Sequence, residues 1–114
     1  MDEQNSARQL IRLALEEDIG TGDLTALAVP PEVRAKARLV AKEPCVLSGL
    51  EMPQLVLEVF GADASVSFPE GVENGKAVKK GELVLELKGR ARDLLTCERT
   101  ILNLLQRLSG VATQ

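Results

Sequence analysis

Apolar and polar residues follow two different periods along the chain. In the first segment apolar residues recur at helical spacing, and Asn5 or Ser6 can cap this helix through a side-chain oxygen. The pattern ends near Asp18, before Gly20 and Gly22. The sequence therefore predicts an N-terminal helix whose apolar positions are Ala7, Leu10, Ile11, Ala14 and Leu15.

The stretch from Arg34 to Lys42 alternates between apolar and basic residues, with Val40 as the exception, which predicts a half-buried strand. The basic side is most simply a solvated surface, and a surface that binds a partner is the alternative. The predicted inner positions are Ala35, Ala37, Leu39 and Ala41, and the outer ones are Arg34, Lys36, Arg38 and Lys42.

Shorter patterns fill the middle of the chain. The apolar run from Pro44 to Leu47 predicts a central strand, and Pro53 suits the first turn of a helix that ends at Gly61. Residues 64–68 alternate again as a strand. The turn-rich segment that follows supplies strand material at Val78 and at 83–87.

The last segment, Leu94 to Gln114, predicts a long helix, with Gly110 as a possible end. At about 100° per residue, one broad apolar face packs against the sheet. Its members are Leu94, Cys97, Ile101, Leu104, Leu105, Leu108 and Ala112.

Arg99 projects from the opposite side of this helix, together with Asn103 and Gln106. It is either a solvent-facing cation or an anion-binding residue, because a guanidinium pairs bidentately with carboxylate or phosphate. Leu102 beside it indicates that something covers this side, for example a second subunit.

Together these elements predict an α+β fold: a small mixed or antiparallel sheet packed by about three helices. The phrase from Gly75 to Val84 resembles half of a biotinyl or lipoyl carrier domain, which implies a hammerhead-like β-motif. In such carriers a modified lysine sits on an exposed hairpin tip. A carrier or interaction module modified at Lys79 or Lys80 is therefore an alternative function.

Composition narrows the function classes. The chain has 114 residues, enough for one domain, and a net charge of −3 without a basic run. It has no Trp, Tyr or His and only two Phe, which argues against base-stacking nucleic-acid platforms and against imidazole chemistry. Cys45 and Cys97 lie in apolar patterns and are expected to be reduced core thiols.

Two short segments bear on location and binding. The start, Met1 to Leu10, is acidic and polar, unlike a secretory signal, and no apolar run reaches the roughly 18 residues of a membrane span. We expect a cytoplasmic protein without nucleic-acid or membrane partners. The stretch Gly20 to Thr25 is expected to be a structural turn, since a phosphate-cradling loop would open a helix and carry a lysine.

The string from Glu98 to Thr113 closely resembles a segment of the quinolinate phosphoribosyltransferases, also called nicotinate-nucleotide pyrophosphorylases (carboxylating). Three further motifs occur in the order found in that family: Glu17 to Thr25, Ser48-Gly49-Leu50, and Val78 with Gly81 and Leu83. The resemblance covers essentially the whole chain. Its close relatives, the nicotinate phosphoribosyltransferases and a homologue from molybdate-transport loci, are the alternatives.

The resemblance implies an enzyme of NAD biosynthesis that converts quinolinate and phosphoribosyl pyrophosphate to nicotinate mononucleotide, carbon dioxide and pyrophosphate, with magnesium. Such enzymes have an N-terminal α+β domain and an open α/β barrel, which holds most substrate and metal ligands. Residues 1–114 are expected to be the N-terminal domain alone, whose last helix leads into a barrel that is absent. This domain is expected to be inactive in isolation.

The resemblance assigns one site residue to this chain. Arg99, in the Glu-Arg-Thr motif, is implied to contact a carboxylate of quinolinate in the active site of the neighbouring subunit, so a homodimer or higher homo-oligomer is expected. No catalytic residue and no metal ligand can be carried over, and magnesium is expected to bind outside these residues.

Overall fold

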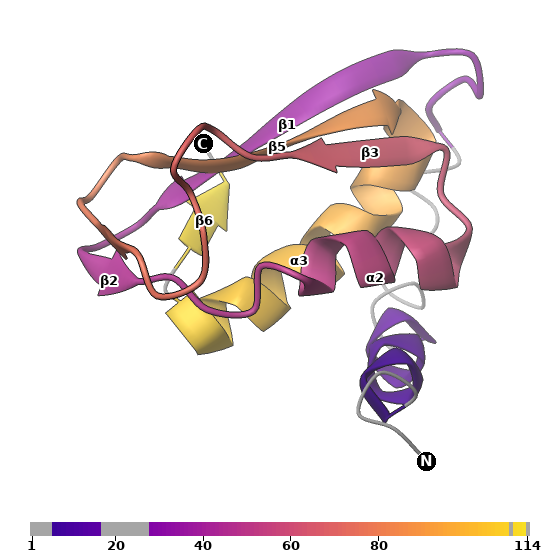
Figure 1. The fold of residues 1–114 in the computed structure, drawn as a ribbon. Helices are drawn as coiled ribbons and strands as arrows, with labels where there is room; N and C mark the ends of the chain where they lie inside the picture. The colour runs from indigo at the N-terminus through magenta and orange to yellow at the C-terminus, as the bar shows by residue number, and fades with distance from the viewer. Residues whose placement is uncertain (1–5, 17–27, 110, 114) are drawn as a thin grey trace.

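Two long strands with alternating side chains form the centre of the main sheet. In the computed structural model, which describes residues 6–16, 28–109 and 111–113, they are β1 (Arg34–Ala41) and β5 (Leu83–Arg90). They pair antiparallel along their length, from Arg34 opposite Arg90 to Val40 opposite Leu83. β3 (Ala64–Ser67) pairs with β5 and β6 (Val111–Thr113) pairs with β1, which gives the order β3-β5-β1-β6 (Figure 1).

The helices lie on one face of this sheet (Figure 1). α2 (Met52–Phe60) has a proline in its first turn and ends at Gly61, whose φ of 78° is left-handed, as the sequence predicts. α3 (Ala91–Ser109) packs against α2, β1 and β5. The N-terminal helix at residues 6–16 lies against α2, where Arg8 forms an ion pair of 2.7 Å with Glu58.

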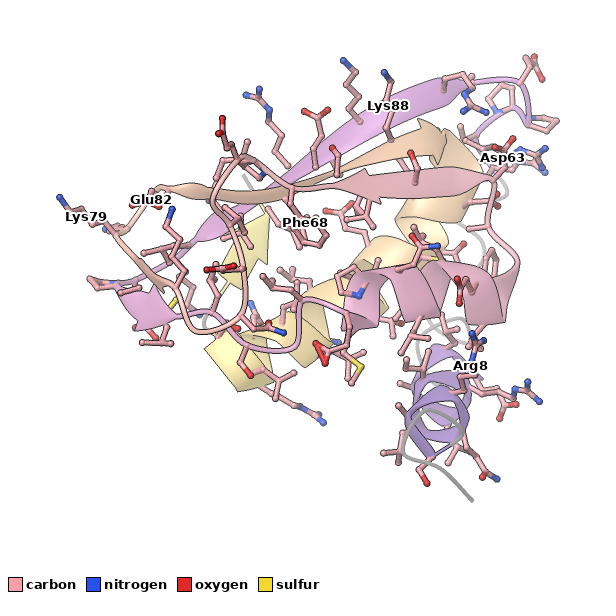
Figure 2. The ribbon with its side chains drawn as sticks, in the orientation of Figure 1. Arg8, Asp63, Phe68, Lys79, Glu82 and Lys88 are labelled. Atoms are coloured by element: carbon pink, nitrogen blue, oxygen red, sulfur yellow. The ribbon has the colours of Figure 1, made fainter. Side chains whose placement is uncertain are left out.

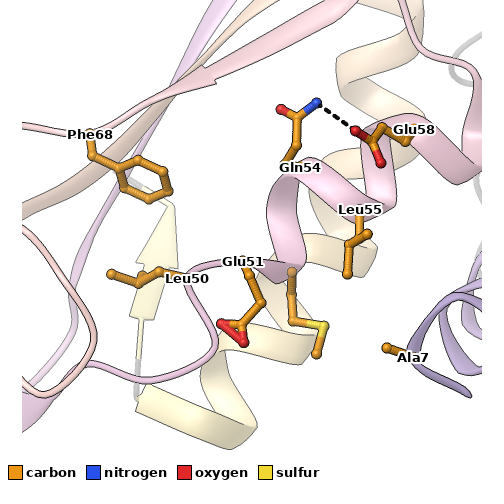
Figure 3. Close-up of a pocket in the computed structure, with 8 residues that line it drawn as sticks. Ala7, Leu50, Glu51, Gln54, Leu55, Glu58 and Phe68 are labelled. Atoms are coloured by element: carbon orange, nitrogen blue, oxygen red, sulfur yellow. Dashed lines mark hydrogen bonds between the residues drawn. The ribbon is translucent and has the colours of Figure 1, made fainter. Parts of the chain in front are cut away.

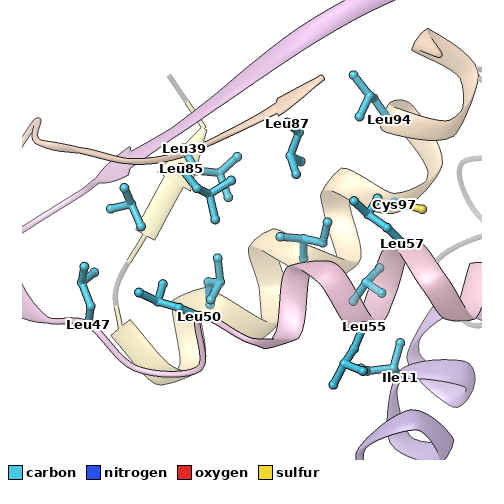
Figure 4. Close-up of a cluster of buried hydrophobic side chains, with 14 of the residues drawn as sticks. Ile11, Leu39, Leu47, Leu50, Leu55, Leu57, Leu85, Leu87, Leu94 and Cys97 are labelled. Carbon is cyan, nitrogen blue, oxygen red and sulfur yellow. The ribbon is translucent and has the colours of Figure 1, made fainter. Parts of the chain in front are cut away.

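The core fills the space between the sheet and the helices (Figure 4). Alternate residues in the second half of β1 point into it, as the alternation predicts, although Ala35 is exposed. In β5 the alternation is interrupted at Val84 and Leu85, which are both buried where the register of the two strands shifts. α3 contributes one stripe of its surface. Buried members include Leu39, Leu85 and Leu87 from the sheet, Val56 and Leu57 from α2, Cys97, Ile101 and Leu105 from α3, and Ile11 from the N-terminal helix.

The observed architecture confirms the α+β class, with three helices in the described residues and strand pairs that are all antiparallel. The prediction of a central strand from Pro44 to Leu47 is wrong. β2 (Cys45–Val46) is two residues long and pairs only with β4 (Ala77–Val78) in a separate two-stranded sheet. Val46 is 58% exposed on this small sheet. The prediction failed because a short apolar run does not distinguish a central strand from a peripheral one.

The last helix is shorter than predicted. α3 ends at Ser109, and residues 111–113 return to the sheet as β6, so Ala112 belongs to a strand. Leu108 is 47% exposed although its spacing predicts burial. Helical periodicity gives the side of the helix that a residue occupies, and it does not say where along the axis the covering sheet stops.

Several predicted features lie outside the described residues. These are the cap at Asn5, the end of the first helix near Asp18, the turn from Gly20 to Thr25, the helix end at Gly110 and the last residue, Gln114.

Candidate functional site

Arg99 lies in the middle of α3, and its side chain is exposed. The helix buries Cys97 and Ile101, each two residues away, and two residues correspond to about 200° around a helix. Arg99 therefore points away from the core, as its spacing predicts. The buried stripe of α3 holds this side chain on the outer side of the helix.

The surface around Arg99 is partly apolar. Leu95, one turn earlier, is 44% exposed. Leu102, one turn later, is half-buried and packs against the core, so the chain itself covers part of this leucine. Asn103 completes the neighbourhood as an exposed amide. A guanidinium beside apolar surface suits a planar anion, because a partner that covers Leu95 also removes water from the ion pair.

A second arginine on the same side of α3 is not singled out by the sequence analysis. Arg92 precedes Arg99 by seven residues, which places it on the same helix face about 10.5 Å away along the axis. Its Nε donates a hydrogen bond to the backbone carbonyl of Val29, and its own carbonyl accepts one from Thr96 Oγ1 at 3.0 Å. The seven-residue spacing from Arg99 is the sequence signal that places Arg92 on the same helix face. Arg92 fastens the segment before β1 to the start of α3.

The C-terminal end of α3 is attached to the loop before α2 by a reciprocal pair of hydrogen bonds. Ser109 Oγ accepts a bond from the Ser48 N–H and donates one to the Ser48 carbonyl, both at 2.7 Å. Gly49 lies next to them with a φ of +76°, and a Cβ there would collide with the side chain of Leu108. Two motifs that are 61 residues apart in the sequence thus meet, which no local pattern predicts.

Neither cysteine is placed for nucleophilic chemistry. Both are free thiols, Cys97 buried and Cys45 half-buried. Burial, with a smaller effect of Asp93, raises the pKa of Cys97 to about 12. Burial and Glu43 raise the pKa of Cys45 as well. A thiol with a raised pKa is protonated near neutral pH and is a weak nucleophile.

An open pocket of about 610 Å³ lies between the N-terminal helix, α2 and the loop that carries Phe68 (Figure 3). Both of its ionisable lining residues are acidic. Arg99 does not line this pocket. The carboxylates of the pocket disfavour anionic ligands. The lining residues are Ala7, Leu50, Glu51, Met52, Gln54, Leu55, Glu58 and Phe68.

Lys79 and Lys80 are exposed in the turn between β4 and β5, beside Glu82 (Figure 2). The two strands pair with different partners, β4 with β2 and β5 with β1 and β3. The turn is therefore not the tip of a hairpin, which is where carrier domains place their modified lysine.

The described residues lack two features that would indicate other functions. They contain no group of three or more His, Cys, Asp or Glu that could hold a metal ion. They also contain no helix that has both the length and the apolar character needed to cross a membrane.

Comparisons with known proteins agree on one family. Residues 23–109 match the family model described as the N-terminal domain of quinolinate phosphoribosyl transferase. The nicotinate-nucleotide pyrophosphorylase (carboxylating) of Mycobacterium leprae is 42% identical over 97% of this chain and 40% of its own length. A protein of Methanocaldococcus jannaschii, named a probable enzyme of the same kind, is 39% identical over 94% of this chain and 36% of its own length.

The solved structures give the same result. The crystal structure of NadC from Streptococcus pyogenes superposes with a TM-score of 0.82 and 36% identity, over 93% of this chain and 38% of that one. The chain thus spans about two fifths of the length of the relatives it matches. The order and pairing of its strands, the outward Arg99 and these matches together lead to one conclusion: the chain belongs to the quinolinate phosphoribosyltransferase family, whose N-terminal domain it matches.

Proposed function

We propose that this chain is the N-terminal, dimer-forming and substrate-contributing domain of an enzyme that converts quinolinate and phosphoribosyl pyrophosphate to nicotinate mononucleotide, carbon dioxide and pyrophosphate. The observation that carries the proposal is the position of Arg99. It is exposed on the outer side of α3, within the Glu98-Arg99-Thr100 motif of the family, and it is separated from the chain's own pocket.

The chemistry of quinolinate suits this residue. Quinolinate is a planar pyridine with two adjacent carboxylates, and a guanidinium binds a carboxylate through two parallel N–H donors. Arg99 binds and orients the substrate in this proposal. It neither moves a proton nor attacks a carbon.

Exposed apolar side chains support a dimer in which this surface is covered. Leu10 is 67% exposed and Leu13 is 58% exposed on the N-terminal helix, and Leu95 is exposed beside Arg99. Burial of such exposed apolar side chains against another protein or domain is favourable. In the proposed dimer, Arg99 enters the active site of the neighbouring subunit. That subunit covers Leu95 and so excludes water from the site.

Magnesium belongs to the remaining part of the enzyme in this proposal. The described residues offer no cluster of acidic ligands for it, so no step of the reaction is assigned to a metal held by this chain. The contribution of the chain is a fixed cation on a rigid helix.

Substitution of Arg99 in the full-length enzyme tests the proposal. Arg99→Ala removes a charge-assisted bidentate contact worth about 2–3 kcal/mol, so quinolinate affinity is expected to fall roughly 30- to 150-fold. Affinity for phosphoribosyl pyrophosphate is expected to change much less. The measurement is the dissociation constant of each substrate by calorimetry, together with the initial rate of pyrophosphate release.

The matched control is Arg107→Ala, which removes an exposed arginine from a different side of the same helix. It is expected to leave both affinities within about twofold. Equal losses for both substrates after Arg99→Ala, or no loss, would remove Arg99 from the substrate site. A preference of the full-length protein for nicotinate over quinolinate would instead assign it to the related nicotinate-specific enzymes.

A further inference from the structure

The side of the main sheet opposite the helices carries a concentration of positive charge. The outward residues of β1 and β5, with Asp63 beside them, are called the basic face below. Figure 2 shows Lys88 projecting from this face, away from α2 and α3. The basic face comprises Arg34, Lys36, Arg38, Glu86, Lys88, Arg90 and Asp63.

Charge is strongly segregated between this face and the rest of the chain. The basic face holds five of the 14 basic residues and two of the 17 acidic ones, a net charge of +3. The remaining nine basic and fifteen acidic residues give −6. An acidic chain that gathers a third of its cations on one open surface presents a complementary site to an acidic partner.

The register of the two strands sets like charges directly opposite each other. Arg34 faces Arg90, and Lys36 faces Lys88. Opposite side chains on one sheet face lie roughly 5 Å apart, where like charges destabilise the pairing. A merely solvated surface explains exposed cations, but it does not explain why two pairs of them oppose each other on the central strands.

One of the two pairs shows how such repulsion is relieved. The Asp63 carboxylate approaches both Arg34, at 3.0 Å, and Arg90, at 3.8 Å. Arg38 likewise pairs with Glu86 at 3.4 Å. Lys36 and Lys88 lie between these two sites, and within the described part of the chain neither forms an ion pair. The centre of the face therefore carries two opposed lysines whose charges no acidic side chain of the described residues offsets within ion-pair distance.

The spacing and length of the row of cations on the basic face indicate the kind of partner that fits it. Outward residues two apart along a strand are separated by about 6.7 Å, so Arg34, Lys36 and Arg38 form a row about 13 Å long. An extended peptide repeats its side chains on one side at the same spacing. A row of this length exceeds a single phosphate or carboxylate ion.

We propose that the basic face binds an extended acidic segment of a partner protein, with carboxylates at alternate positions and one of them between Lys36 and Lys88. Single-stranded nucleic acid fits less well, because its binding needs aromatic platforms. The chain has no Trp or Tyr, and its two phenylalanines belong to α2 and to the pocket. A two-fold contact with a second copy would set +3 against +3.

The test uses the 114-residue chain and a fluorescein-labelled peptide of five glutamates alternating with threonines. Binding is measured by fluorescence anisotropy at low salt and is mapped by amide chemical shifts. We expect the Lys36→Gln/Lys88→Gln variant to weaken binding at least tenfold. The matched variant Lys79→Gln/Lys80→Gln removes the same charge from exposed lysines away from the face, and we expect its affinity to stay within twofold.

Three outcomes would overturn the proposal. Equal weakening in both variants would show general charge attraction, and absence of peptide binding to the wild-type chain would show that the face is only solvated. Tighter binding of a six-nucleotide single strand than of the peptide would make it a nucleic-acid surface. Circular dichroism confirms that each variant is folded, and the single variants Lys36→Gln and Lys88→Gln provide a second measurement if the double variant is not.

Discussion

At the scale of single residues, Gly89 is the position in β5 where a side chain is least tolerated. A Cβ there would collide with the backbone oxygen of Asp63 and with the backbone and side chain of Ala64. The backbones of β3 and β5 cannot easily move apart, because the two strands pair over four residue pairs. The absence of a side chain at Gly89 is therefore what allows β3 to approach β5 at this point.

Gly89→Ala is expected to lower the free energy of unfolding by about 2–3 kcal/mol through overpacking. The control is Gly61→Ala, where no atom lies within 4 Å and the left-handed φ alone costs about 1 kcal/mol. Urea unfolding of the three proteins measures both changes. A loss at Gly89 no larger than the loss at Gly61 would contradict this account of β5.

Cys97 connects a single side chain to the alkaline stability of the fold. Its pKa is raised from an ordinary value near 9.0 to about 12 in the folded chain. Above pH 9 the unfolded state releases a proton that the folded state retains. The stabilisation is thus complete below about pH 9 and is lost progressively as the pH rises to 12.

We expect the free energy of unfolding to fall more steeply between pH 9 and 11 in the wild-type chain than in Cys97→Ala, by at most about 1.4 kcal/mol per pH unit. No phenol interferes, because the chain has no Tyr. The comparison uses slopes, since the substitution also leaves a small cavity. Urea unfolding at several pH values provides the data, and parallel curves would show that the Cys97 thiol does not contribute.

At the scale of secondary structure, the contact between Ser48 and Ser109 sets where α3 ends. Ser109→Ala removes both hydrogen bonds and is expected to lower the free energy of unfolding by about 1–2 kcal/mol. Ser67→Ala, on the exposed side of β3, is the control and should change stability by less than about 0.5 kcal/mol.

Amide hydrogen exchange separates a local effect from a global one. If Ser109 acts as a clamp, exchange of the Ser48 amide accelerates more than exchange of the Leu85 amide in the middle of β5. Equal acceleration of both amides would mean that Ser109 contributes only to overall stability.

Sequence patterns predicted elements well where one period ran long enough. The alternation from Arg34 and the helical pattern around Cys97 and Ile101 correctly placed β1, α3 and the outward direction of Arg99. They failed where tertiary contacts decide the outcome. The apolar run at β2 indicates a strand but cannot show that its partner is β4, and β6 depends on its contact with β1 and has no local signature.

The sequence predicts the residues around Arg99 less completely than the direction in which its side chain points. The family motif singled out Arg99, but Arg92 belongs to no motif and was missed. The function of Ser109 depends on a loop 61 residues earlier in the chain. Periodicity describes one element at a time, so it cannot show which distant element covers a given turn of helix.

At the scale of the whole molecule, the proposed function gives this chain a binding role through Arg99 and the helix that holds it, which is too little for the proposed reaction. We expect the 114-residue chain alone to release no pyrophosphate from phosphoribosyl pyrophosphate in the presence of quinolinate and magnesium. It has no His, and both of its thiols have raised pKa values. A coupled pyrophosphate assay checks this expectation, and quinolinate-dependent release from the pure chain would contradict it.

The position of β1 at the centre of the sheet has a consequence for synthesis on the ribosome. Both neighbours of β1, β5 and β6, are made more than 40 residues after it, so the first long strand must wait unpaired while the rest of the chain emerges. Pairing between strands so far apart is slow compared with helix formation. The alternating lysines and arginines of β1 provide protection during this interval, because like charges along an exposed strand repel identical strands of neighbouring nascent chains.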